Sequence, residues 1–171
     1  MEKTKTHTIF ETACFTGYRP EKLPWGYDET DEAAQRLKLR LADVCALLYD
    51  GGIRRYLCGM ARGADTYFAE ELLKLKAQYP DVSVEAAIPC PQQSDRWPAG
   101  DRERYLSILR QCDEITVVSR EYTKWCMLER NKYMVNLSSV LVAVFDGQPG
   151  GTKFTRDYAE KRGLEIVDIL L

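Results

Sequence analysis

Short apolar runs alternate with segments of helical period along the whole chain. The first helical segment shows this pattern clearly, because its apolar positions step by four, three and four residues to form one stripe: Leu37, Leu41, Val44 and Leu48. Gly51 and Gly52 follow and predict the end of this helix. The run 140–145 is apolar at every position, which is typical of a strand covered on both faces of a sheet.

The whole pattern predicts six strands and five helices. The strands are expected at 8–16, 55–58, 82–88, 114–119, 140–145 and 165–170, and the helices at 31–50, 64–78, 101–111, 124–137 and in a last segment that ends near 162. Such alternation indicates parallel strands joined by crossover helices. We therefore expect a single Rossmann-like domain over 1–171, an α/β fold whose doubly wound, mainly parallel sheet has helices on both faces. Such sheets bind ligands at the carboxyl ends of their strands, where the strand order reverses.

Composition narrows the classes of function. The 171 residues include 24 Lys and Arg against 26 Asp and Glu, for a formal charge of −2, so no signal for nucleic acid or an anionic membrane emerges. The longest apolar run, 140–145, is too short for a membrane span, and the first residues lack a secretory h-region, so we expect a cytoplasmic protein. One histidine, His7, and six cysteines without a CxxC pair exclude the common zinc motifs and favour buried thiols. No metal and no required cofactor are expected.

The loop after the first strand is the first candidate for ligand binding. It has the sequence TGYRP over 16–20, in which Gly17 permits close backbone approach and Arg19 offers a planar fork to an anion. Tyr18 is a candidate for stacking on a base, as is Trp97 in the loop after the third strand. The alternatives are a tight turn with a solvated arginine, and simple surface packing of the tryptophan.

Two further loops place small residues where a helix begins. The first, GMARGAD over 59–65, opens the second helix and offers four candidate ligand contacts: Gly59, Arg62, Gly63 and Asp65. The second, DGQPGGT over 146–152, opens the last helix and offers three: Gly150, Gly151 and Thr152. Free backbone N–H groups at a helix N-terminus bind anions, so both loops are candidate phosphate cradles. Tight packing, a capping role for Asp65 and a hairpin-like turn at 146–152 are the alternatives.

The fourth predicted helix adds a cation and an amide. Met127, Asn131 and Met134 share one face at helical spacing, so Asn131 is expected to point toward the sheet or a pocket, where its amide needs partners. The preceding residue, Arg130, is a candidate to neutralise a phosphate. A satisfied core asparagine is the alternative.

In combination, these motifs resemble the YpsA-like family of the SLOG superfamily: TGYRP, GMARGAD, RNKYMV and DGQPGGT occur in that order, and the resemblance covers 15–168. It implies the Rossmann-like fold shared by the DNA-processing protein DprA and the LOG cytokinin-activating enzymes, together with a nucleotide-type ligand. LOG enzymes carry PGGxGTxxE, whose glutamate acts on the N-glycosidic bond of a nucleotide. Here Thr155 stands three positions after Thr152, so that acid is missing or relocated.

The leading hypothesis is therefore a domain that binds or senses a nucleotide or nucleotide derivative, such as ADP-ribose or an NAD-like compound. The glycine-rich loops and Thr152 would hold phosphate, Arg19 and Arg130 would neutralise charge, and Asp65 and Asn131 would read ribose or base. The expected partner is a small molecule rather than nucleic acid, no membrane is expected, and a homo-oligomer is compatible with the sequence.

Two other classes of function stay open. One is a nucleotide hydrolase of the phosphoribohydrolase type, in which Asp65, Asp146 or Glu129 supplies the relocated carboxylate. The other is an interaction protein whose pocket is vestigial. No catalytic residue is assigned, and we expect little hydrolytic turnover because threonine cannot supply the negative charge at position 155.

Overall fold

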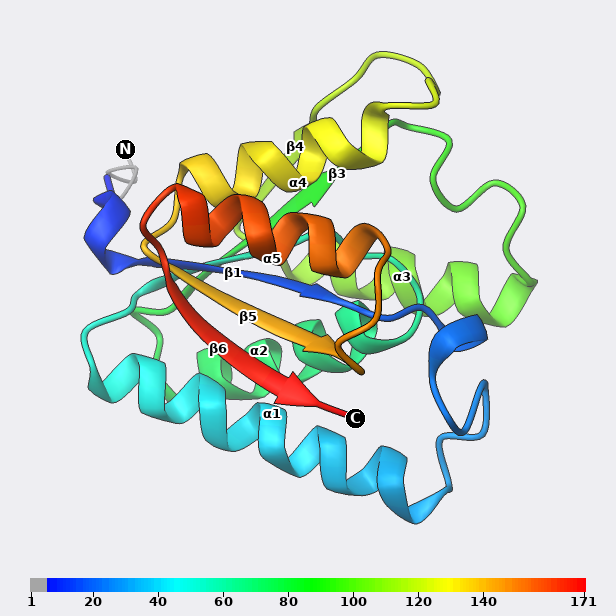
Figure 1. The fold of residues 1–171 in the computed structure, drawn as a ribbon, viewed down its shortest axis with the longest axis horizontal. Helices are drawn as coiled ribbons and strands as arrows, with labels where there is room; N and C mark the ends of the chain where they lie inside the picture. The colour runs from blue at the N-terminus through cyan, green and yellow to red at the C-terminus, as the bar shows by residue number, and fades with distance from the viewer. Residues whose placement is uncertain (1–5) are drawn as a thin grey trace.

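A six-stranded, all-parallel sheet forms the centre of the computed structural model, which describes residues 6–171 (Figure 1). Its strands are β1 (Thr12–Gly17), β2 (Arg55–Cys58), β3 (Ser83–Ile88), β4 (Glu114–Val117), β5 (Val140–Phe145) and β6 (Glu165–Leu170). They lie in the order β4-β3-β2-β1-β5-β6. The chain therefore builds outward from β1 in one direction as far as β4, then returns to the other side of β1. The point where the order reverses lies between β1 and β5.

The helices cover both faces of this sheet. They are α1 (Glu32–Asp50), α2 (Ala64–Gln78), α3 (Ala99–Gln111), α4 (Cys126–Asn136) and α5 (Gly151–Lys161), with two short 3₁₀ turns, η1 (Ile9–Glu11) and η2 (Pro20–Lys22). Contacts join α1 to α2 and α2 to α3 on one face, and α4 to α5 on the other (Figure 1). Right-handed crossovers require this division, because the strands up to β4 are added on one side of β1 and the later strands on its other side. The predicted doubly wound α/β fold is confirmed.

The predicted element bounds are confirmed within about two residues except at the start of the first strand. Residues 8–11 are not strand, because the amide of Thr8 donates to the Glu11 carboxylate at 3.1 Å and closes the turn η1. This local capping hydrogen bond replaces sheet pairing and leaves the Phe10 side chain 85% exposed. The expectation of a strand from residue 8 was wrong for that reason.

The core lies between β1, β5 and the helices. Every residue of β5 is buried, as its unbroken apolar run predicts. Phe15 on β1 stacks on Phe68 of α2, with ring centroids 4.4 Å apart, and fixes the helix start close to the end of the strand. All six cysteines are free thiols, five of them buried. Among residues 6–171, no helix is both long enough and apolar enough to cross a membrane.

Candidate functional site

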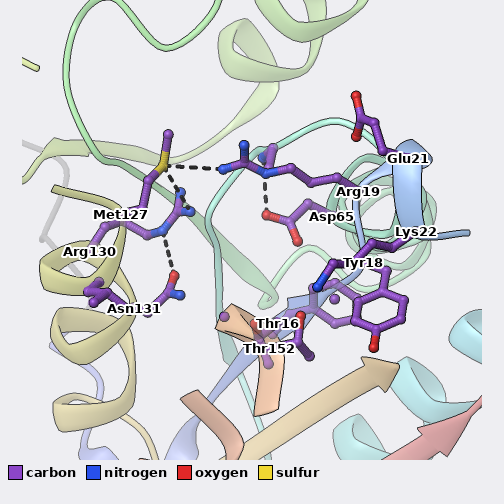
Figure 2. A pocket seen from close by; sticks show the side chains of 15 residues that line it. Thr16, Tyr18, Arg19, Glu21, Lys22, Asp65, Met127, Arg130, Asn131 and Thr152 are labelled. Carbon is purple, nitrogen blue, oxygen red and sulfur yellow. Dashed lines mark hydrogen bonds between the residues drawn. The ribbon is translucent and has the colours of Figure 1, made fainter. Parts of the chain in front are cut away.

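A cavity of about 330 Å³ lies at the carboxyl edge of the sheet, where β1 and β5 are neighbours. We call it the switch-point cavity. Eight of the predicted site residues line it: Gly17, Tyr18, Arg19, Asp65, Arg130, Asn131, Gly151 and Thr152. They come from the end of β1 and the loop after it, from the first turns of α2 and α5, and from α4. Figure 2 shows the side chains of six of them around one space: Tyr18, Arg19, Asp65, Arg130, Asn131 and Thr152. The fold thus brings both glycine-rich helix starts to the same edge, as the motif order predicted.

The start of α5 is the open cradle of the two. Gly150 is its N-cap, and no side chain caps the helix. Within residues 6–171, the backbone N–H groups of Gly151 and Thr152 donate to no other group. A Cβ placed on Gly151 would meet nothing within 4 Å, and both residues line the cavity. This arrangement of unused donors at the positive end of a helix can hold a phosphate.

At the start of α2, other parts of the protein already occupy the space in front of the helix. The N–H of Ala64 donates to the carbonyl of Tyr18 at 3.0 Å. Gly63 adopts φ = 87°, and a Cβ there would approach the carbonyl oxygen of Tyr18 to 2.7 Å. A Cβ on Gly59 would approach the Arg130 guanidinium to 2.5 Å. Neither glycine lines the switch-point cavity, so close packing, the alternative reading, accounts for both.

Arg130 is a buried cation at the floor of the site. Its side chain donates to the carbonyl oxygens of Gly59 and Ala87, at the ends of β2 and β3, and the residue is only 4% exposed. Burial lowers the pKa of Arg130, whereas the negative charge of Asp65 opposes that change. The role of Arg130 in joining two strand ends to α4 is therefore evident before any ligand is considered.

Asp65 places a carboxylate in the same cavity. Its Oδ2 accepts the N–H of Ala61 at 3.0 Å, which closes the turn at the start of α2. Burial raises the pKa of Asp65, and the positive charge of Arg130 acts in the opposite direction. Of the three acids considered for hydrolysis, Asp65 is the one that lines the switch-point cavity.

The other two acids have structural partners elsewhere. Asp146 accepts from the hydroxyl of Tyr18 and from the N–H of Gln148, and the Tyr18 hydrogen bond is the main cause that lowers the pKa of Asp146. Glu129 accepts from the hydroxyl of Ser119 at 3.1 Å. Among the described residues, no group of three or more His, Cys, Asp or Glu side chains is arranged to hold a metal ion.

The amide of Asn131 is used inside the protein. Its Oδ1 accepts from Nε of Arg130 at 2.8 Å, and its Nδ2 donates to Oγ1 of Thr155 at 2.9 Å. Thr155 in turn donates to the carbonyl of Gly151 at 3.0 Å. Asn131 thus connects Arg130 to the first turn of α5, and its satisfied amide matches the alternative reading. Thr155 is buried on this path, so no carboxylate stands where LOG enzymes have their glutamate.

Two exposed cations face the mouth of the cavity. Arg19 donates to the sulfur of Met127 at 3.4 Å, which is a weak acceptor (Figure 2). Lys22 also lines the cavity, with its Nζ 5.2 Å from the ring centroid of Tyr18. A Cβ on Gly150 would approach that Nζ to 2.7 Å, so Lys22 lies beside the α5 cradle. The sequence reasoning missed Lys22, although its position three residues after Arg19, on a turn that follows β1, was a usable signal.

Arg62 and Trp97 do not line the switch-point cavity; together they border a neighbouring recess. Arg62 forms ion pairs with Asp101 at 3.2 Å and Glu21 at 3.6 Å. Its guanidinium carbon lies 5.6 Å from the centroid of the Trp97 ring. Tyr18 does line the cavity, but its ring is flanked by Lys22 and its hydroxyl binds Asp146. The two stacking candidates therefore belong to different hollows.

Comparison with known proteins identifies relatives of this chain. The family model YpsA, described as the YspA SLOG family, matches residues 13–166. A UPF0398 protein of Bacillus anthracis (strain A0248) is 27% identical over 152 residues, which are 86% of this chain and 82% of the relative. The UPF0398 protein of Bacillus cereus (strain B4264) is 26% identical over the same shares.

Solved structures extend the likeness to DprA. The X-ray structure of DprA from Streptococcus pneumoniae has a TM-score of 0.61 at 14% identity, over 93% of this chain and 50% of the other. This chain thus spans half the length of that protein. DprA from Helicobacter pylori, in a structure that concerns its binding of single-stranded DNA, gives a TM-score of 0.50 at 14% identity, over 93% of this chain and 75% of the other. These likenesses show the fold, whereas the match over 13–166 shows the family: the chain belongs to the YpsA family of SLOG proteins.

Proposed function

We propose that this protein binds a nucleotide or a nucleotide derivative, of the ADP-ribose or NAD type, in the switch-point cavity. The observation that carries the proposal is the uncapped start of α5, where the N–H groups of Gly151 and Thr152 are free at the edge of the cavity. Arg19 and Lys22 lie at the mouth and supply positive charge to a phosphate held there. The cavity volume of about 330 Å³ falls in the range of small-molecule sites, roughly 300–1,000 Å³.

Single-stranded nucleic acid is the other ligand class to weigh, because one DprA structure of similar fold concerns DNA binding. Strand binding relies on a basic groove with aromatic platforms. The formal charge of −2 and the acids Glu21 and Asp65 in the cavity lining favour a small nucleotide instead. The proposal retains a cytoplasmic setting and is compatible with a homo-oligomer.

Isothermal titration calorimetry with AMP and NAD tests the proposal. Gly151→Val adds a branched side chain to the cavity lining at the start of α5, in space that is open, so it should abolish binding while the fold remains intact. Gly100→Val is the matched control, because Gly100 also has nothing within 4 Å and lies at the start of α3, outside the cavity lining. Binding by Gly151→Val at the wild-type affinity, or no binding by the wild type, would contradict the proposal.

A second candidate function is hydrolysis of a nucleotide N-glycosidic bond with Asp65 as the acid or electrostatic group. It is favoured by the position of Asp65 in the cavity and by the raised pKa that burial gives this carboxyl group. The binding proposal predicts that AMP, NAD and ADP-ribose release no base or ribose above background. Turnover that Asp65→Asn removes, in a variant whose urea unfolding still shows a folded protein, would give hydrolysis precedence.

A further inference from the structure

The strand β6 lies at one side of the sheet and has a free edge (Figure 1). Among the described residues it pairs with β5 alone, in register along its whole length. The N–H groups of Glu165 and Leu171 donate to carbonyls of the segment 139–145, which contains β5. Successive residues of a parallel strand alternate in direction, so three residues of β6 present their N–H and C=O groups outward: Ile166, Asp168 and Leu170. These groups are available to another strand.

The sequence of β6 does not block such pairing. Proteins protect free edges with lysine, proline or a bulge, and β6 contains none of these. The one charge in its interior, at Asp168, is bound by Arg156 of α5 at 2.9 Å. Large apolar side chains are exposed near both ends of the strand, where Leu170 is 62% and Leu47 of α1 is 68% exposed. An unprotected edge beside exposed apolar side chains is typical of an interface.

Two hollows lie between this edge and α1, one at each end of β6. The hollow at the carboxyl end, of about 370 Å³, is lined by 169–171 of β6 and its end, and by Arg36 and Arg40 of α1. We call it the basic hollow. The hollow at the amino end, of about 400 Å³, is lined by Glu165 and by Leu47 of α1, and we call it the acidic hollow. The other residues that line the two hollows are uncharged.

The charges of these hollows are complementary but lie apart within one molecule. Arg40 and Glu165 are both exposed, and neither forms an ion pair among residues 6–171. Because the hollows are at opposite ends of β6, they cannot neutralise each other in one chain. A second copy that runs antiparallel along the edge brings each basic hollow to the acidic hollow of the other copy. A two-fold axis uses the same surface on both subunits, so the pattern fits the chain to itself.

We propose that two copies of this chain associate through antiparallel pairing of their β6 edges, which joins the two sheets into one. The outward backbone groups must face one another, and this restricts the register. A two-fold axis beside Val167 satisfies the requirement, because Ile166 then lies opposite Asp168 of the second copy. An axis beside Asp168 would instead set two like charges against each other, which is unfavourable.

The register at Val167 also aligns the hollows. Glu165 then lies opposite Ile169 of the second copy, and Ile169 lines the basic hollow together with Arg40. Each dimer therefore contains two contacts between Glu165 of one copy and the basic hollow of the other. This association does not depend on nucleotide binding, since neither hollow shares a residue with the lining of the switch-point cavity.

Sedimentation equilibrium of the full chain over a range of concentrations tests the association. The wild type should reach twice the 19.6 kDa mass of one chain. Arg40→Glu and Glu165→Arg should each raise the dimer Kd at least about tenfold, because each sets like charges against one another at two places. The double variant restores opposite charges and should return the Kd toward the wild-type value. Lys132→Glu is the matched control, because Lys132 is an exposed cation on α4 outside both hollows.

A disulfide tests the register. The Cα atoms of a non-hydrogen-bonded antiparallel pair are about 4.5 Å apart, which a disulfide can span. Val167→Cys oxidised with diamide should therefore run as a covalent dimer on a non-reducing gel. The wild type, whose six thiols are free and mostly buried, should not.

Three results would overturn the proposal. The first is a wild type that remains monomeric at every concentration. The second is a dimer whose Kd neither charge reversal changes, which would place the interface elsewhere, as on the free edge of β4. The third is a double variant that dimerises no better than the single variants. A monomeric Val167→Cys band would overturn the axis beside Val167.

Discussion

Replacement of Arg130 by methionine tests whether this buried cation holds the carboxyl edge of the sheet together. The guanidinium is 4% exposed, donates to the carbonyls of Gly59 and Ala87, and interacts electrostatically with Asp65. Methionine retains an apolar stem of similar length but removes every donor and the charge. The variant therefore leaves two buried carbonyls, the amide oxygen of Asn131 and a buried carboxylate without the guanidinium.

The expected loss of stability follows from these contacts. A buried carbonyl that loses its donor costs about 1–3 kcal/mol, and the buried carboxylate of Asp65 loses the nearby positive charge that opposes the rise of its pKa. These effects overlap, because one guanidinium serves all four groups, so we expect about 3–5 kcal/mol in total. At about 2–4 °C per kcal/mol for a chain of this size, the Tm should fall by roughly 10 °C.

Urea unfolding followed by circular dichroism measures this loss, with Lys132→Met, an exposed cation on the same helix, as the matched control. Asp65→Asn should lower the free energy of unfolding less in the Arg130→Met background than in the wild type, because there it removes an uncompensated charge. A loss below about 1 kcal/mol for Arg130→Met, or strict additivity in the double variant, would refute the assigned role of this pair.

Three other predictions concern two cations of the switch-point cavity, a glycine of its lining, and an ion pair outside it. Arg19→Ala and Lys22→Ala should each weaken AMP binding about tenfold in calorimetry and leave the free energy of unfolding unchanged, because both side chains are exposed; wild-type affinity in both variants would contradict this. Gly17→Ala should destabilise the fold by about 1–3 kcal/mol in urea, because its Cβ would approach that of Ala64 to 2.8 Å; an unchanged midpoint would show that the contact is relieved. Hydrogen bonds from Arg104 lower the pKa of Glu29 from 4.5 to about 2, so this group adds stability above pH 4.5 that is lost as the pH falls toward 2; Glu29→Gln should flatten that part of the stability–pH curve, and an unchanged slope would contradict the assignment.

Regular, local patterns predicted most of the fold. The period of α1 and the apolar run of β5 depend on neighbours a few residues apart, so both elements were placed correctly from sequence. The start of β1 was not placed correctly. The apolar pair at 9–10 favours a strand, whereas the hydrogen bond between Thr8 and Glu11 forms a turn there instead. That bond is local, but propensity alone does not reveal whether it or the sheet prevails.

The candidate site was predictable only to the level of which loops converge. The role of each glycine depends on what lies opposite its Cα, and that neighbour is distant in sequence. Gly59 is small because Arg130 packs on it, whereas Gly151 faces open space. The same distinction separates Arg130, which is committed to backbone carbonyls, from Arg19, which is exposed. No spacing rule in the chain carries this information.

A crystal structure of the protein grown with AMP tests the central claim most directly. We predict that the phosphate lies at the start of α5, with its oxygens within about 3.2 Å of the N–H groups of Gly151 and Thr152, and that Arg19 has left Met127 to meet it. A phosphate bound on another edge of the sheet, or a cavity without AMP at a concentration that saturates binding in solution, would contradict the account.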